Sequence, residues 1–227
     1  MRNRYYPLFL DIRDRACLVV GGGKVGARKA KGLLAAGARV IVVSPEMDAA
    51  IEALLPDERL TLKRRAYLPS DMAGAFLVIG ATDHAELNRR IKKDAQAAKA
   101  LCNVADQPQL CDFILPAVVN QGDLSLAITT AGKSPALAKR LRRQLQAQFG
   151  PEYAALTALL GAIRTRLLAE GHDPEGHRRA LNTLLDGDIL GLLRAERTAE
   201  IDTLLAEALG PGYDYMGLTA EPIDSRQ

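Results

Sequence analysis

A glycine-rich turn between an apolar run and a helical segment constrains the fold of this chain more than any other feature. The apolar run 16–20 is followed by GGGKVG at residues 21–26, and then by ARKAKGLLAAGA and RVIVV. This order predicts a strand, a turn, a helix that ends at Gly37, and a second strand at 39–43. Two strands joined by one helix pair in parallel, so the chain is predicted to adopt an α/β fold.

The turn also predicts a binding site for a dinucleotide. Gly21, Gly23 and Gly26 fit the pattern G-x-G-x-x-G, in which backbone amides and the positive end of the helix face a pyrophosphate. Glycine-rich turns also occur for purely structural reasons, so the motif alone leaves that alternative open. Its position after a strand and before a helix favours the binding site.

The following segments repeat the alternation of strands and helices. Strands are predicted at 60–64, 75–80 and 101–104, with a helix at about 86–100. Since ligands bind outside the carboxyl ends of parallel strands, residues after these strands should reach the dinucleotide. The predicted cofactor contacts at the glycine turn and the strand ends are Gly21, Gly22, Gly23, Lys24, Val25, Gly26, Ser44, Pro45, Glu46, Thr82, Asp83, Asn103 and Val104.

Two carboxylates in this set of segments each have two interpretations. Glu46 lies about 20 positions after the last glycine, where an acidic residue contacts the ribose hydroxyls, but it would equally suit the start of the next helix. Asp106 follows the strand 101–104 and is predicted to lie beside the nicotinamide. It is also a common turn residue, and Gln107 and Pro108 come directly after it.

The rest of the chain has a different character. Two apolar runs, FILPAVVN and LSLAITT, flank the turn residues Gly122 and Asp123, which predicts a strand pair outside the parallel sheet. A helix should start at Pro135, and further helices are expected at about 153–170, 175–185 and 198–209. The predicted domains are residues 1–112, 113–149 and 150–227. The glycine- and proline-containing tail after Gly210 is expected either to have little order or to lie over a partner.

Composition and charge argue against several classes of protein. The net charge of +3 is small and dispersed, so we expect neither a nucleic acid nor a membrane as partner. Apolar runs stay shorter than the roughly 20 residues of a membrane span, and the polar start lacks the features of a secretory signal, so a cytoplasmic protein is expected. The three cysteines are expected to be reduced, and no metal site is expected from His84, His172 and His177.

Four ordered blocks make a family resemblance visible. They are YPLFLDIRDRACLVVGGGKVGARKAKGLLAAGARVIVVSP, LVIGATDHAELN, LCNVADQPQLCDFILPAVV and LSLAITTAGKSPALAKRLR. Together they resemble the precorrin-2 dehydrogenase/sirohydrochlorin ferrochelatase family, which includes the amino-terminal half of siroheme synthase and a stand-alone fungal enzyme. The resemblance covers roughly residues 7–149, and this chain is expected to be a stand-alone form.

The resemblance implies an NAD-binding Rossmann domain, a central dimerisation region and a helical domain, assembled as a homodimer. It implies NAD-dependent oxidation of precorrin-2 to sirohydrochlorin, with Asp106 as the catalytic residue of the N-V-x-D block. Many members of the family also insert ferrous iron, and the sequence leaves open whether this chain does so, whether cobalt is used, and which pathway takes the product. A Rossmann module that senses NAD without catalysis is the alternative from a different functional class.

The tetrapyrrole substrate carries many carboxylates, so the resemblance implies basic and hydrogen-bonding groups around it. One basic run consists of Lys139, Arg140, Arg142 and Arg143. The alternative for this run is a solvated helix face. Two departures from the family are that Gly26 replaces a frequent alanine and that Thr130 replaces a serine. The predicted substrate contacts are Thr130, Lys133, Ser134, Lys139 and Arg140.

Overall fold

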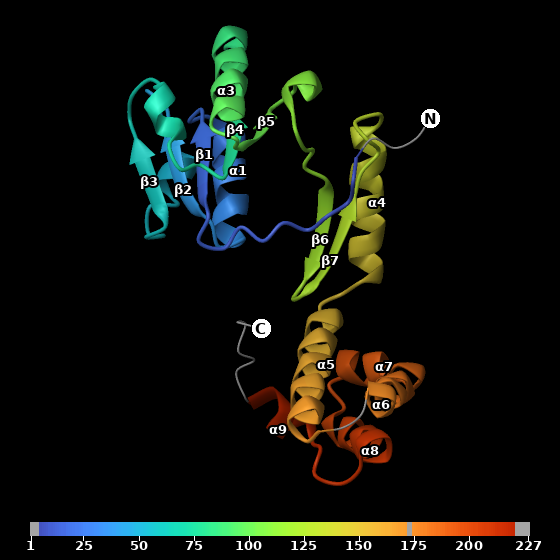
Figure 1. Ribbon diagram of the computed structural model, residues 1–227. Helices are drawn as coiled ribbons and strands as arrows, with labels where there is room; N and C mark the ends of the chain where they lie inside the picture. The colour runs from blue at the N-terminus through green and yellow to red at the C-terminus, as the bar shows by residue number, and fades with distance from the viewer. Residues whose placement is uncertain (1–4, 172–173, 221–227) are drawn as a thin grey trace. The chain divides into compact units, whose positions relative to one another are not determined.

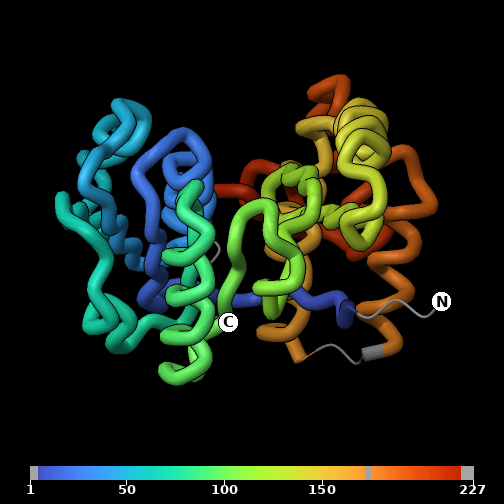
Figure 2. Tube along the Cα trace, turned by 90° about the horizontal axis from the view of Figure 1, so that it is seen from above, coloured from blue at the N-terminus to red at the C-terminus, as the bar shows by residue number. Residues whose placement is uncertain are grey.

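The computed structural model describes residues 5–171 and 174–220. The chain divides into two compact units, Met1–Leu115 and Pro116–Gln227. Figures 1 and 2 follow the chain from the blue and green segments of the first unit to the yellow and red segments of the second.

The first unit is built on one five-stranded parallel sheet. The strands lie in the order β3-β2-β1-β4-β5, so the chain starts in the middle of the sheet and adds strands first on one side and then on the other (Figure 1). This confirms the predicted α/β fold with an open parallel sheet. The strands are β1 (Ala16–Val20), β2 (Arg39–Val43), β3 (Leu60–Lys63), β4 (Leu77–Gly80) and β5 (Leu101–Val104).

Both faces of this sheet are covered, as a parallel sheet requires. Along β1 the side chains alternate, with Cys17 and Val19 in one buried cluster and Leu18 and Val20 in the other. Helix α1 (Lys24–Ala35) packs Ala27, Ala30 and Leu34 into the first cluster. Helix α3 (Ala85–Ala97) packs Ile91 and Ala95 into the second. The short elements are α2 (Ala49–Glu52), η1 (Pro69–Met72) and η2 (Pro108–Leu110).

A buried carboxylate holds the connection between β3 and β4. The side chain of Asp71 is 1% exposed, and it accepts hydrogen bonds from the Arg65 guanidinium, the Leu68 amide at 3.0 Å and the Lys63 ammonium at 2.9 Å. The Arg65 bonds, with those of Leu68 and Lys63, hold the pKa of Asp71 well below its usual range, against the effect of burial. These bonds fix the segment that carries Tyr67, which is buried against the sheet.

The second unit begins with an antiparallel hairpin in a separate sheet, as predicted. Strand β6 (Ala117–Gln121) pairs with β7 (Leu124–Ile128) across the turn at Gly122 and Asp123. The apolar run 113–116 before β6 stays outside the strand, since Pro116 has no amide hydrogen to donate to a sheet. Helix α4 (Pro135–Gln148) follows, and the Ser134 hydroxyl caps its start by accepting from the Leu137 amide.

The remainder of the second unit is helical. Its buried core includes Leu159 and Ile163 of the longest helix together with Leu184, Ile189 and Leu205. The helices are α5 (Glu152–Ala169), α6 (Pro174–Asp186), α7 (Ile189–Arg194), α8 (Thr198–Leu209) and α9 (Tyr215–Ala220). None of the described helices is long and apolar enough to cross a membrane.

The expectation of little order after Gly210 is wrong for residues 213–220. Tyr213 and Leu218 are buried in the helical core, and the Tyr213 hydroxyl donates to Glu170 at 2.5 Å. The glycines and proline of this tail therefore form a turn that returns the chain to the core. Residues 221–227 lie outside the described residues.

Candidate functional site

The glycine turn is fastened to the neighbouring strand ends by backbone contacts. The Gly21 amide donates to the Val43 carbonyl at 3.0 Å, and the Asp48 amide donates to the Gly22 carbonyl at 2.8 Å. Gly21 has a φ of +119°, and a Cβ there would lie 2.3 Å from the Ala81 carbonyl oxygen. This position therefore requires glycine for both its conformation and its close packing.

The other glycines of the motif differ in what surrounds them. A Cβ at Gly22 would lie 2.0 Å from the Glu46 carbonyl oxygen, and one at Gly26 would lie 2.0 Å from the Gly21 carbonyl oxygen. This close approach explains the glycine at position 26. Gly23 has open space where a Cβ would lie. It is the N-cap residue of α1, and no described side chain caps the helix there. The first amides of α1 are therefore available to an anionic ligand.

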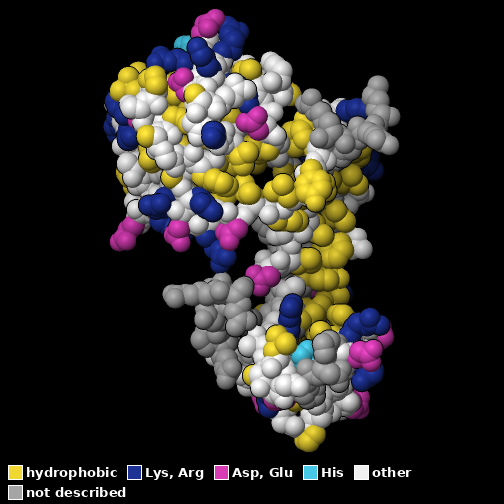
Figure 3. Space-filling view, in the orientation of Figure 1, with side chains coloured by type: hydrophobic (Ala, Val, Ile, Leu, Met, Phe, Trp, Pro, Cys, Tyr) yellow, Lys and Arg dark blue, Asp and Glu magenta, His cyan; other side chains and the backbone are white. Residues whose placement is uncertain are grey.

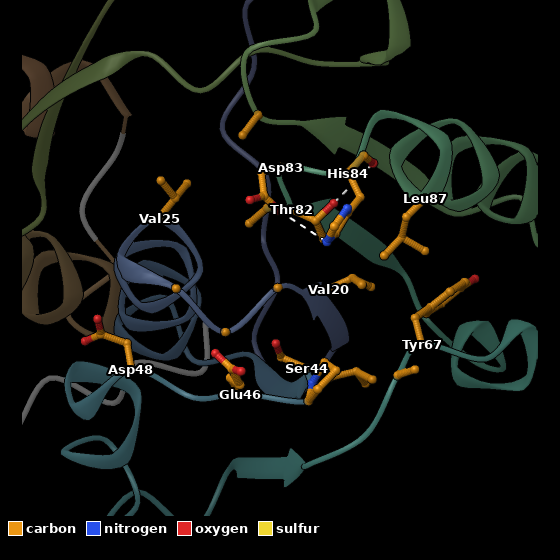
Figure 4. Close-up of a pocket in the computed structure, with 18 of the residues that line it drawn as sticks. Val20, Val25, Ser44, Glu46, Asp48, Tyr67, Thr82, Asp83, His84 and Leu87 are labelled. Carbon is orange, nitrogen blue, oxygen red and sulfur yellow. Dashed lines mark hydrogen bonds and ion pairs between the residues drawn. The ribbon is translucent and has the colours of Figure 1, made fainter.

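A cleft of about 1330 Å³ lies over the carboxyl ends of β1, β2, β4 and β5. This volume exceeds that of typical pockets for small ligands and suits an extended dinucleotide. In Figure 4 the cleft lies between Ser44 and Glu46 on one side and Thr82, Asp83 and His84 on the other. The Tyr67 ring and Leu87 lie together at one end of the cleft (Figure 4).

Most of the predicted cofactor contacts line this cleft together. The exceptions are Gly26, Asn103 and Val104, which are buried outside its lining. Asn103 instead donates from Nδ2 to the Phe113 carbonyl at 2.9 Å. The predicted residues in the lining are Gly21, Gly22, Gly23, Lys24, Val25, Ser44, Pro45, Glu46, Thr82, Asp83 and Asp106.

The structure separates the two interpretations of Glu46 and makes those of Asp106 compatible. The next helix is capped by Asp48, whose side chain accepts from the Ala50 amide at 2.9 Å, and Glu46 is left to line the cleft. Asp106 does occupy a turn, with a φ of +59°, and it lines the cleft as well. Aspartate tolerates this left-handed conformation better than most residues, so the turn role and a role in the cleft are compatible.

Sequence patterns did not single out several residues that line the cleft. Tyr67 follows β3, and its hydroxyl donates to Asp94 at 2.9 Å, while Arg90 on α3 lies 5.9 Å from the centre of the Tyr67 ring. Leu87 and Arg90 are three positions apart on one helix, which is a signal that could have placed them on a common face. The missed residues include Val43, Met47, Asp48, Ala66, Tyr67, His84, Leu87 and Arg90.

The charges around the cleft are mainly negative. Four carboxylates line it, from Glu46, Asp48, Asp83 and Asp106, against the two cations Lys24 and Arg90. A further cation, Lys29 of α1, lies near Asp106 and Cys111. Burial and Arg28 lower the pKa of Lys29, and Asp106 and Cys111 act in the opposite direction.

The predicted substrate contacts belong to the second unit. The Thr130 hydroxyl accepts from the Ser134 amide at 2.9 Å, and Ser134 caps α4, so both hydroxyls already organise this loop. Lys133, Lys139 and Arg140 are exposed. The described residues contain no cluster of side chains that could hold a metal ion, and His172 lies outside them.

Comparisons with known proteins agree with this arrangement. Residues 8–117 match the family described as putative NAD(P)-binding, and residues 121–148 match the central region of sirohaem biosynthesis proteins. The solved structure of SirC, a precorrin-2 dehydrogenase, superimposes with a TM-score of 0.74 at 27% identity, covering 90% of this chain and 98% of SirC.

Over most of its length the chain is similar to siroheme synthases and to the precorrin-2 dehydrogenase SirC. The siroheme synthase of Thioalkalivibrio sulfidiphilus is 36% identical over 92% of this chain, and that of Methylobacillus flagellatus is 40% identical over 70%. The alignments cover 43% and 34% of those two proteins, so the chain spans less than half of each. The match of residues 8–117 to a putative NAD(P)-binding family supports a nicotinamide cofactor for this chain.

The glycines of the first unit allow a test of the close packing at the turn. Gly22→Ala would force a Cβ against the Glu46 carbonyl, so we expect the free energy of unfolding to fall by about 2 kcal/mol, with weaker binding of NADH. Gly32→Ala is the matched control, because Gly32 lies in α1 with open space around it. It should stabilise the fold by roughly 0.5–1 kcal/mol and leave binding unchanged. Urea unfolding and NADH fluorescence titration measure both effects, and equal behaviour of the two variants would contradict the expectation.

Proposed function

We propose that this chain oxidises precorrin-2 to sirohydrochlorin with NAD as the hydride acceptor. The observation that carries the proposal is the presence of Asp106 and the glycine turn in the lining of one cleft. The relative SirC, which the chain covers almost entirely, is named a precorrin-2 dehydrogenase. Similarity to siroheme synthases and to SirC also favours catalysis over the alternative of a non-catalytic module that senses NAD.

The chemistry divides between the cofactor and the chain. The nicotinamide ring, when bound, supplies the acceptor for the hydride that leaves the macrocycle. Asp106 is the group that takes the accompanying proton, as a general base at the edge of the cleft. The uncapped amides at the start of α1 would hold the pyrophosphate, and Glu46, which lines the cleft, would contact the ribose hydroxyls.

Substitution of Asp106 tests this assignment. Asp106→Asn removes the base but keeps a side chain that tolerates the φ of +59°, whereas Asp106→Ala also strains the turn. We expect Asp106→Asn to bind NAD normally and to oxidise precorrin-2 on the order of a hundredfold more slowly. The measurement is absorbance of sirohydrochlorin and NADH, together with a separate titration of cofactor binding. Oxidation within about threefold of wild type would remove Asp106 from the mechanism.

We propose further that NAD is preferred over NADP. The 2′-phosphate of NADP would bring negative charge to the end of β2, where Glu46 and Asp48 already line the cleft. Repulsion between like charges in a partly enclosed site disfavours that ligand. Arg90 is the cation on the opposite wall, where it lies 3.9 Å from Asp94.

Removing the Glu46 carboxylate should change the cofactor preference. For Glu46→Ser we expect the ratio of kcat/KM for NADP to that for NAD to rise by about tenfold or more. Glu58→Ser is the control, because Glu58 is exposed and outside the cleft lining, and its loss changes the net charge equally. An unchanged ratio in Glu46→Ser, or wild-type turnover as fast with NADP as with NAD, would contradict the proposal.

We propose that side chains of the second unit contact the substrate. Its basic side chains Lys133, Lys139 and Arg140 are exposed, and they provide counter-charges for the substrate carboxylates. Thr130 and Ser134, in the segment before α4, are the further proposed substrate contacts. Insertion of ferrous iron or cobalt into the product is a second proposed activity, in which Asp106 would accept pyrrolic protons. A cytoplasmic location stays a prediction.

We propose a homodimer built on the hairpin and α4. A two-stranded sheet is marginally stable alone, and within β6, β7 and α4 only Val119 is fully buried. Val118 and Leu137 are 37% and 47% exposed. Figure 3 shows hydrophobic side chains gathered over these elements, which is typical of a surface that a partner covers.

The oligomeric state provides the test of this surface. Light scattering at micromolar concentration should give twice the 24.5 kDa chain mass for the wild type. Val118→Asp would place a charge in the proposed interface and should yield monomers. Leu168→Asp is the control, because Leu168 is 56% exposed on α5 and outside the hairpin and α4, and it should remain dimeric. A monomeric wild type would refute the proposal.

A further inference from the structure

The turn that carries Asp106 lies at an edge of the parallel sheet. Strand β5 is the last strand in the order, so alternate backbone groups point away from β4 and need other partners. The chain leaves β5 at Val104, passes Asp106 and η2, and returns beside the strand at residues 111–113. The return segment therefore determines where the turn can lie.

Side chains of the return segment satisfy the outward-facing groups of β5. The Cys102 amide donates to the Asp112 carboxylate at 3.0 Å, and the Asp112 amide donates back to the Cys102 carbonyl at 2.8 Å. Two residues further along, the Val104 amide donates to the Cys111 sulfur at 3.2 Å. The Asp112 carboxylate thus accepts a hydrogen bond from the middle of β5, and the Cys111 sulfur accepts one from the end nearest to Asp106.

The Cys111 sulfur lies at the centre of the turn. Besides the Val104 amide, it is 3.5 Å from the Asn103 amide nitrogen, which acts as a donor. It lies 3.3 Å from both the Val104 and the Gln107 carbonyl oxygens, to either of which the thiol can donate. The thiol therefore connects the residues on both sides of Asp106, at 104 and at 107.

This arrangement is specific to one of the three cysteines. Cys17 and Cys102 are buried in the sheet, and burial raises the pKa of each thiol to about 11. Cys111 lies outside the strands, and its sulfur makes the polar contacts described above. Replacing it with an apolar side chain would leave the amide of Val104, a residue that is 2% exposed, without this partner.

We propose that Cys111 is a positioning residue for Asp106, holding the turn so that the carboxylate faces the cleft. The inference rests on the proposed function, since it matters only where Asp106 accepts a proton. Backbone strain at Asp106 makes the support necessary, because a left-handed residue is held in place by the structure around it. Small displacements of a general base cost activity because proton transfer requires hydrogen-bond distance.

The test measures precorrin-2 oxidation by Cys111→Ala and Cys111→Ser. We expect Cys111→Ala to lower kcat by about tenfold while the KM for NAD stays within about twofold. Serine keeps a donor and an acceptor, so Cys111→Ser should recover most of the lost kcat. Cys17→Ala is the control, because it removes a buried cysteine that has no contact with the turn. It should lower stability but keep kcat.

A double variant separates positioning from general damage. If Cys111 acts through Asp106, adding Cys111→Ala to Asp106→Asn should lower kcat by less than about twofold, because the base is already absent. A further tenfold loss in that background would overturn the proposal, and so would a Cys111→Ala enzyme with wild-type kcat. Wild-type activity in Asp106→Asn alone would overturn the catalytic role of Asp106, and the positioning role of Cys111 would be overturned with it. Loss in Asp106→Asn with no loss in Cys111→Ala or Cys111→Ser would refute only the positioning role.

Discussion

The close packing of the glycine turn is the constraint on which the site depends. The carbonyl oxygens of Gly21, Glu46 and Ala81 lie where side chains at positions 26, 22 and 21 would otherwise be. Because these backbones touch, the ends of β1, β2 and β4 converge and the first amides of α1 face the cleft. The same contacts leave no room for larger residues at positions 21, 22 and 26, so at the turn itself the backbone lies next to the cleft.

Around this rigid turn, other contacts hold the remaining walls of the cleft. The buried Asp71 ion cluster fixes the segment that carries Tyr67, which lines the cleft with Leu87. Asp106 lies at the exposed end of β5, held by a turn whose conformation depends on side chains that arrive later in the sequence.

Sequence patterns were enough to predict some elements but not others. Strands β1, β2 and β5 and helix α1 could be predicted because apolar periodicity and the glycine turn agree with each other. Helix α7 was missed because its six residues show too little periodicity. Helix α9 was missed because turn residues precede it, whereas burial of Tyr213 and Leu218 in the helical core stabilises it. Tyr67 and Arg90 could not be placed in the site, because they reach it from elements that become neighbours only in the folded sheet.

The sequence by itself determined the α/β fold, the glycine turn and the strand ends that form the cleft, since these follow from local periodicity and from the geometry of parallel strands. It also singled out Glu46 and Asp106, but it left each between two roles. Only the tertiary structure decided that Asp48 caps α2 while Glu46 lines the cleft, and that Asp106 occupies a left-handed turn in the same lining. The contacts of Cys111 were likewise decided by tertiary structure, because they depend on an edge strand and a return segment whose side chains meet only after the sheet has formed.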